Sequence, residues 1–175
     1  MKVVIIYESM YGNTHHVAEK IAEVALESAD LVELIAVSHA VPDSIDGADL
    51  VVVGGPTHIH SLTSAATRRD AIDHADKYGS PSIDPDAEGP GLRDYFDSLG
   101  RVAGTKAAAF DTRFDAAAIL TGRASKGISQ RLRKHGFNEV VPAESFIVDK
   151  ENHLLDGQDE HAVRWTRSVM EAASS

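Results

Sequence analysis

The sequence predicts an α/β fold in which helices cover both faces of a parallel sheet, and three observations lead to this prediction. Residues 2–7 (KVVIIY) and 48–56 (ADLVVVGGP) are continuous apolar runs, as expected for strands that are buried on both faces. Segments with apolar residues at helical spacing alternate with such runs along the chain. Right-handed crossovers between parallel strands then leave few topologies.

Five segments are predicted to be strands: 2–7, 31–37, 48–56, 105–111 and 139–148. Each is rich in β-branched or other apolar residues, which favour the interior of a sheet. The last segment contains Pro142, which indicates an edge strand or a bulge because proline cannot donate a hydrogen bond to a neighbouring strand.

Helices are predicted between these strands, at 16–28, 61–78, 92–99, 125–136 and 157–173. The fourth ends at Gly136, a residue type that commonly follows the last turn of a helix. The stretch 78–91 (YGSPSIDPDAEGPG) is rich in proline and glycine, so we expect an irregular surface segment there.

Composition limits the classes of function. A chain of 175 residues fits one domain, 1–175, and the absence of cysteine excludes disulfides, iron–sulfur clusters and thiol nucleophiles. The net charge of −10 argues against nucleic acid as a partner. The N-terminal apolar run is too short for a signal peptide and no window reaches membrane-spanning length, so we expect a cytoplasmic protein with no membrane partner.

Three loops follow the carboxyl ends of predicted strands: residues 8–14, 55–63 and 111–122. Ligands of open parallel sheets bind at this edge, where the strand order switches. These loops are therefore the candidate binding site.

Residues 8–14, here called the opening loop, have the composition of an anion site. A helix start offers unpaired N–H groups and partial positive charge, to which Ser9, Asn13 and Thr14 add neutral donors. Gly12 permits a close approach of the backbone. Neither G-x-x-x-x-G-K-[ST] nor G-x-G-x-x-G occurs here. The alternative is a helix that Asn13 or Thr14 caps without any ligand.

The run IIYESMYGNTHHVAEKI, residues 5–21, resembles the flavodoxin signature. The matching positions are Tyr7, Ser9, Gly12, Thr14, Ala18 and Ile21. The resemblance implies a three-layer αβα, doubly wound sheet of five strands in the order 2-1-3-4-5, with FMN at the switch point. It implies that Ser9 to Thr14, including Met10 and Tyr11, hold the phosphate and that the other two loops enclose the isoalloxazine ring.

Two groups of residues would then lie around the ring. They are Pro56, Thr57, His58, Ile59 and His60 after the third strand, and Asp111, Thr112, Arg113 and Phe114 after the fourth. His58 occupies the place of a tryptophan that stacks on the flavin in many flavodoxins, and the place of a stacking tyrosine falls near Ala117. The alternatives are exposed loop histidines and an Arg113 that pairs on the surface with Asp111 or Asp115.

Three functions are compatible with this reading. The first is an FMN electron carrier between a reductase and an acceptor protein, without a catalytic residue of its own. The second is an FMN enzyme such as an NAD(P)H:quinone reductase or a menaquinone-linked oxidase, and the third is a flavin-free interaction domain.

No structural metal is expected, since His58 and His60 lack an obvious carboxylate partner. Arg68 and Arg69 are predicted to lie on a solvated helix face.

Overall fold

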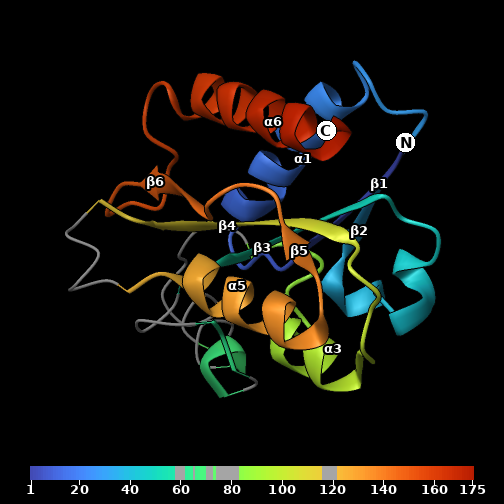
Figure 1. Ribbon diagram of the computed structural model, residues 1–175. Coiled ribbons are helices and arrows are strands. Elements are labelled where there is room, and N and C mark those ends of the chain that lie inside the picture. The colour runs from blue at the N-terminus through green and yellow to red at the C-terminus, as the bar shows by residue number, and fades with distance from the viewer. Residues whose placement is uncertain (58–61, 65, 70–72, 74–82, 116–121) are drawn as a thin grey trace.

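The strands lie in one parallel sheet, at whose centre β1 and β3 are side by side (Figure 1). The computed structural model describes residues 1–57, 62–64, 66–69, 73, 83–115 and 122–175. Within them the strand order is β2-β1-β3-β4-β5, and a sixth strand, β6, also pairs with β4. The strands are β1 Lys2–Tyr7, β2 Leu31–Ala36, β3 Leu50–Pro56, β4 Lys106–Phe114, β5 Asn138–Glu139 and β6 Glu144–Val148. The predicted fold class and strand order are confirmed.

Helices cover both faces of this sheet (Figure 1). Helices α1 and α6 pack on one face, where Ile5, Phe110 and Trp165 belong to one apolar core. Helices α3 and α5 pack on the other face, over a second core that includes Ile6 and Ile128. The helices are α1 Asn13–Ala25, α3 Leu92–Ser98, α5 Ala124–His135 and α6 Gln158–Ser174, with 3-10 turns at η1 Val37–His39 and η2 Pro42–Ile45. None of the helices in the described ranges is long and apolar enough to cross a membrane.

Strand β4 is longer than the sequence suggests. The pattern predicts its end at residue 111, whereas the strand continues to Phe114. Its last residues pair with Gly55 and Pro56 of β3 on one side and with 144–148 of β6 on the other. Asp111 to Phe114 therefore belong to a strand rather than to the loop in which they were expected.

The predicted strand 139–148 is two strands. Residues 138–139 pair with the beginning of β4, and 144–148 pair with its end. Residues 140–143, which include Pro142, separate them. Pro142, which was expected to mark an edge strand or a bulge, lies in this break, so the single strand predicted over 139–148 is wrong in its continuity.

The region between β3 and α3 is described only in part. Of the predicted helix 61–78, residues 66–69 and 73 are helical, and most of the others lie outside the described residues. Of the irregular stretch 78–91, residues 83–91 are described, and three of them, Asp84, Ala87 and Gly91, are buried. Gly136, with φ 93°, ends α5 as predicted.

Candidate functional site

The opening loop joins β1 to α1 through a tight turn. Gly12 precedes the helix with φ 88°, a left-handed conformation that favours glycine. Its N–H donates to the Ser9 hydroxyl oxygen at 3.1 Å, which closes the turn. The loop therefore delivers the backbone directly into the first turn of α1.

The first turn of α1 presents amide groups that have no acceptor within the described part of the chain. Among the described residues nothing accepts from the N–H groups of Asn13, Thr14 and His15, and the helix has no side-chain cap. The first turn also contains no acidic side chain. Free N–H groups and the helix dipole together favour an anion at this position.

Two hydroxyl groups meet beside this turn. Thr14 Oγ1 lies 2.7 Å from Thr112 Oγ1, and both side chains are buried. One hydroxyl donates to the other, so the second keeps a hydrogen for another acceptor. The first loop and the end of β4 are thereby brought together, as the sheet topology predicts.

The side chain of Asn13 has a different partner from the one expected. Its amide donates to the Asn152 carbonyl at 2.8 Å and so ties α1 to the turn after β6. Asn152 adopts φ 66° in that turn, where Asp149 accepts from the N–H groups of Glu151 and His153. These hydrogen bonds, that from His153 first, lower the pKa of Asp149.

Residues 83–91 support the opening loop. The Asp84 N–H donates to the Met10 carbonyl at 2.8 Å. Met10 is 2% exposed and packs with Ala87, while Tyr11 and Ile83 flank this pair. The predicted site residues Met10 and Tyr11 thus form a small apolar cluster with this segment.

A histidine of the first turn lies beside the loop. His15 stacks on Tyr7 with the ring centroids 4.5 Å apart, and its Nδ1 lies 3.3 Å from the buried carboxylate of Asp84. Burial and then the charge of Asp86 raise the pKa of Tyr7. His15 is therefore held by the site rather than exposed, whereas His16 is exposed and meets Asp159.

The ends of β3 and β4 are joined to the start of α5. Asp111, fully buried, accepts from the Thr57 hydroxyl and from the Ser125 N–H. The Thr57 hydroxyl in turn accepts from the Ala124 N–H at 2.8 Å. Since Arg123, the N-cap residue, makes no side-chain cap, Thr57 and Asp111 perform that role.

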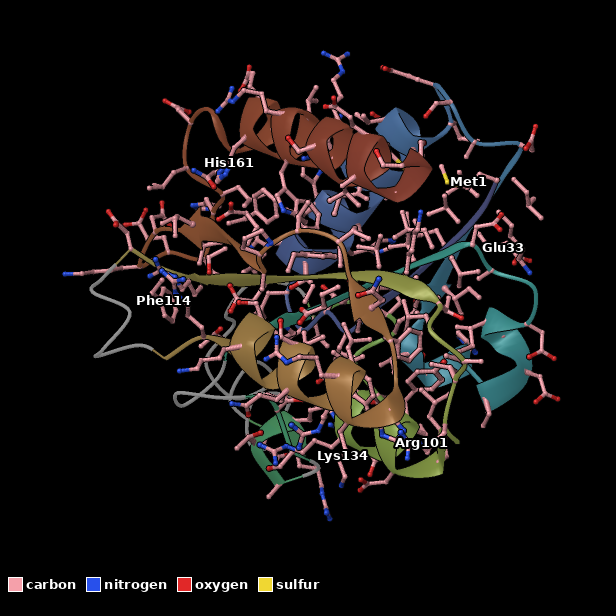
Figure 2. The ribbon with its side chains drawn as sticks, viewed as in Figure 1. Met1, Glu33, Arg101, Phe114, Lys134 and His161 are labelled. Carbon is pink, nitrogen blue, oxygen red and sulfur yellow. The ribbon has the colours of Figure 1, made fainter. Side chains whose placement is uncertain are left out.

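The remaining predicted residues of the ring site are only partly described. Phe114, at the end of β4 (Figure 2), is 48% exposed. The Arg113 guanidinium donates to the Phe114 carbonyl at 3.3 Å. Pro56 pairs with Thr112. His58, Ile59, His60 and Ala117 lie outside the described residues.

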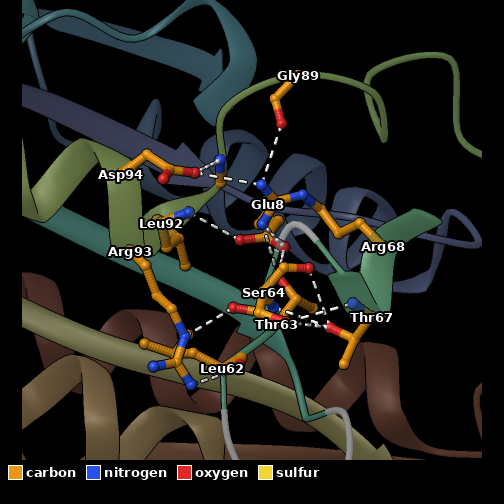
Figure 3. A network of polar contacts seen from close by, with 11 residues as sticks. Glu8, Leu62, Thr63, Ser64, Thr67, Arg68, Gly89, Leu92, Arg93 and Asp94 are labelled. Atoms are coloured by element: carbon orange, nitrogen blue, oxygen red, sulfur yellow. Dashed lines mark hydrogen bonds and ion pairs between the residues drawn. The ribbon is translucent and has the colours of Figure 1, made fainter. Parts of the chain in front are cut away.

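A buried ion pair, which was not predicted from the sequence, joins Glu8, the first residue of the opening loop, to Arg68 (Figure 3). Glu8 is 3% exposed and Arg68 is 5% exposed, so the prediction that Arg68 is solvated is wrong. Arg68 Nη1 lies 3.7 Å from Glu8 Oε1, and its Nη2 donates to Asp94 and to the Gly89 carbonyl. The available signal was Glu8 itself, a carboxylate directly after a fully apolar strand, where a buried charge needs a partner.

Gly91 leaves the space for this pair. A Cβ at Gly91 would lie 2.1 Å from Arg68 Nη1 and 2.9 Å from Glu8 Oε2. The Gly91 N–H donates to Asp94 at 2.8 Å. This hydrogen bond, and then Arg68, lower the pKa of Asp94.

Comparison with known proteins agrees with this geometry. The family model of the flavodoxin domain matches residues 4–68, and no curated protein matches the sequence. Oxidised flavodoxin 1 from Bacillus cereus superposes with a TM-score of 0.68 at 20% identity, over 98% of both chains. A flavodoxin from the domain Archaea gives a TM-score of 0.67 at 18% identity, over 100% of both chains.

A larger protein contains the same fold as one part. In rubredoxin oxygen:oxidoreductase from Desulfovibrio gigas, this chain covers 36% of the other protein, with a TM-score of 0.62 at 18% identity. The matched N-terminal segment, 4–68, includes the whole opening loop, and the flavodoxins superpose over nearly the entire chain. The N-terminal part of the chain is therefore similar to the flavodoxin domain, and the whole chain has the fold of the solved flavodoxins.

Proposed function

We propose that the protein binds FMN and carries electrons between a reductase and an acceptor protein. The observation that carries the proposal is the first turn of α1, where the N–H groups of Asn13, Thr14 and His15 have no acceptor among the described residues. A phosphate monoester satisfies such groups and gains from the helix dipole.

The residues around this turn fit a phosphate. Ser9, Thr14 and Thr112 bring hydroxyl groups. The space beside Gly12 is open, because no described atom lies within 4 Å of a Cβ built at this residue. The donor set is neutral, as expected from the absence of lysine and arginine in residues 8–14. Met10 and Tyr11, packed against residues 83–91, keep the loop in shape.

The ring would lie beside the ends of β3 and β4. The candidate residues are Pro56, Thr57, His58, Ile59, His60, Asp111, Thr112, Arg113 and Phe114. Bound flavin supplies the redox chemistry, and the protein supplies binding, orientation and the electrostatic environment. Buried Asp111 contributes to the electrostatic part, and Arg113 stabilises negative charge on a reduced ring.

The surface charge favours basic redox partners. The net charge is −10, and carboxylates border the opening loop on two sides. Asp86 lies on the side of Tyr7, and Asp149 and Glu151 lie in the turn that contacts Asn13. Such a field steers a basic partner toward the site. A carrier of this kind belongs in the cytoplasm.

An FMN enzyme that reduces a quinone is the second candidate. Phe114, the aromatic residue at the end of β4, is 48% exposed and is therefore accessible to a substrate. If this function is correct, the purified protein alone will consume NAD(P)H when a quinone is added. The carrier requires a separate reductase for the same reaction.

An absorbance spectrum recorded during anaerobic reductive titration tests the proposal. The purified protein, or the protein after incubation with FMN, should show a bound flavin spectrum that bleaches on reduction. Protein that remains colourless and takes up no added FMN would leave the flavin-free interaction domain as the function.

A further inference from the structure

Glu8 lies where three segments of the chain meet (Figure 3). Its N–H donates to the Gly54 carbonyl at 2.9 Å, so the backbone here still follows the β1–β3 pairing. Its carboxylate accepts from the Thr63 hydroxyl and, at 2.8 Å, from the Leu92 N–H. Glu8 thus contacts β3, the last residue of the second predicted loop (55–63) and the start of α3.

Arg68 completes the junction from the other side. Nη1 donates to Thr63 Oγ1 at 3.2 Å, and Nη2 donates to the Gly89 carbonyl and to Asp94. The same guanidinium therefore holds the chain after the second loop and the segment that supports Met10. Its charge also compensates that of Glu8, since both side chains are buried.

The carbonyl groups beside Thr63 are held as well. Arg93, in α3, donates to the Thr63 carbonyl from Nε and to the Leu62 carbonyl from Nη2, each at 2.8 Å. Residues 62 and 63 are thus held through backbone and side chain. Residues 62 and 63 are the described residues at the end of the second predicted loop, so these contacts fix the position of that end.

We propose that Glu8 and Arg68 are positioning residues that hold the opening loop in one fixed relation to residues 62–64 and 66–68. The inference rests on the proposed function. Ser9, the residue after Glu8, begins the part of the site assigned to the phosphate, and Thr57 and Thr63 belong to the second predicted loop, 55–63, which is assigned to the ring. Neither side chain needs to touch the flavin, because each acts through the backbone of these segments. Loss of the pair then displaces the ring end of the site relative to the phosphate end.

A buried ion pair can fix the relative position of two segments, because its energy depends strongly on the distance between the two charges. Removal of one partner leaves an uncompensated buried charge, so arrangements that separate Glu8 from Arg68 are strongly disfavoured. Gly91 is compatible with the pair because it has no Cβ in the space of the guanidinium. The pair therefore selects one arrangement of the loops.

The test compares this pair with an exposed pair of the same residue types. The variants are Arg68→Met, Glu8→Gln and the double variant. The controls are Arg167→Met and Glu27→Gln, whose charged groups lie 3.4 Å apart on the surface between α6 and α1. Far-ultraviolet circular dichroism verifies that each protein is folded, and Glu8→Gln preserves an acceptor oxygen if Arg68→Met does not fold.

In the flavin-bound protein we expect the affinities for FMN and riboflavin to fall together, by about five- to thirtyfold, in Arg68→Met. The midpoint potential should shift too, because the two redox states contact the displaced loop differently. The surface controls should stay within about twofold of the wild type. Unchanged riboflavin affinity and potential in folded Arg68→Met and Glu8→Gln proteins would overturn the proposal.

Hydrogen exchange of the flavin-free protein gives an independent result. In Glu8→Gln, the amides of residues 62–64, 66–69, 89, 91 and 92 should exchange faster together, whereas the same amides in the surface controls should not change. Faster exchange in only one of these segments would contradict the coupling. If the wild type binds no flavin, the proposed function fails, while this measurement still decides whether the pair couples the segments.

Discussion

The hydroxyl oxygens of Thr14 and Thr112 lie 2.7 Å apart, so the first turn of α1 is bonded directly to the end of β4. The two residues are 98 positions apart in the sequence. Parallel strands bring their carboxyl ends to one edge, where a helix start and a neighbouring strand can share a polar contact. The hydroxyl of Thr14 is consequently oriented before any anion binds.

Removal of the opening-loop hydroxyls should weaken FMN binding selectively. A hydrogen bond to a charged acceptor contributes about 1.5–3 kcal/mol, so we expect Thr14→Val to weaken FMN binding by about 10- to 150-fold. Combined Ser9→Ala and Thr14→Ala should weaken it further. Riboflavin, which lacks the phosphate, should bind nearly as to the wild type, and flavin fluorescence titration measures both.

The matched variant is Thr112→Val. It removes the hydroxyl that orients Thr14 but leaves the first turn of α1 intact, so a smaller effect of about two- to fivefold is expected for FMN. Equal losses for FMN and riboflavin in Thr14→Val would show that the phosphate lies elsewhere.

Gly91→Ala should destabilise the protein strongly. Its φ of −106° is open to alanine, so the cost comes from the Cβ, which would lie 2.1 Å from Arg68 Nη1. Displacement of the guanidinium from Glu8 should lower the free energy of unfolding by about 2–4 kcal/mol. Urea unfolding followed by the fluorescence of Trp165 measures this.

Gly100→Ala is the control for that experiment, because nothing lies within 4 Å of an added Cβ there. Its effect should be within about 0.5 kcal/mol. Similar stabilities for the two alanine variants would show that the space at Gly91 is not needed.

Asp94 should make stability depend on acid pH. The Gly91 N–H and then Arg68 hold its pKa below the ordinary value of 3.8. A carboxyl group with a lowered pKa in the folded state contributes stability above its unfolded pKa and loses it as the pH falls through the folded pKa. The contribution should therefore be complete above about pH 5 and should decrease below the ordinary value of 3.8.

The measurement is the free energy of unfolding of the wild type and of Asp94→Asn from about pH 2.5 to about pH 6, a range that includes the ordinary pKa of an aspartate. The difference should be constant at the upper end and shrink at the lower end. A difference that grows with acid would mean that Asp94 is not stabilised as the carboxylate.

Thr57→Val should loosen the start of α5. The Thr57 hydroxyl accepts from the Ala124 N–H and donates to Asp111, so valine leaves that N–H without its acceptor and removes one of the two hydrogen bonds to Asp111. We expect a loss of about 1–2 kcal/mol in the free energy of unfolding. Thr57→Ser retains the hydroxyl and should stay within about 0.5 kcal/mol; equal losses in both variants would exclude the cap.

The sheet could be predicted because burial on both faces leaves a visible pattern. Val51 to Val53 and their neighbours form an uninterrupted apolar run, which is the pattern of a strand that is buried on both faces. The end of β4 escaped prediction because Asp111, Thr112 and Arg113 are polar. Their strand conformation is imposed by pairing with β3 and β6, which the local sequence does not contain.

In the candidate site, too, some features could be predicted from the sequence and others could not. The helix start and Gly12 could be predicted from local residue types, since their conformation depends on neighbours in the sequence. Asn13 and Arg68 could not, because their partners Asn152 and Glu8 come from distant segments. The contacts of the flavin remain a prediction from resemblance.

The division of the outer strand affects how the folded protein resists aggregation. An uninterrupted edge would offer a row of free peptide groups for another chain to extend. Here β5 and β6 present only short runs, and Ile147 of β6 already donates to the side chain of Gln158 and accepts from the Leu155 N–H. Fibril growth by strand addition is thus opposed at this border of the sheet, and the opposite border, β2, is the place where protective charges such as Glu33 matter most.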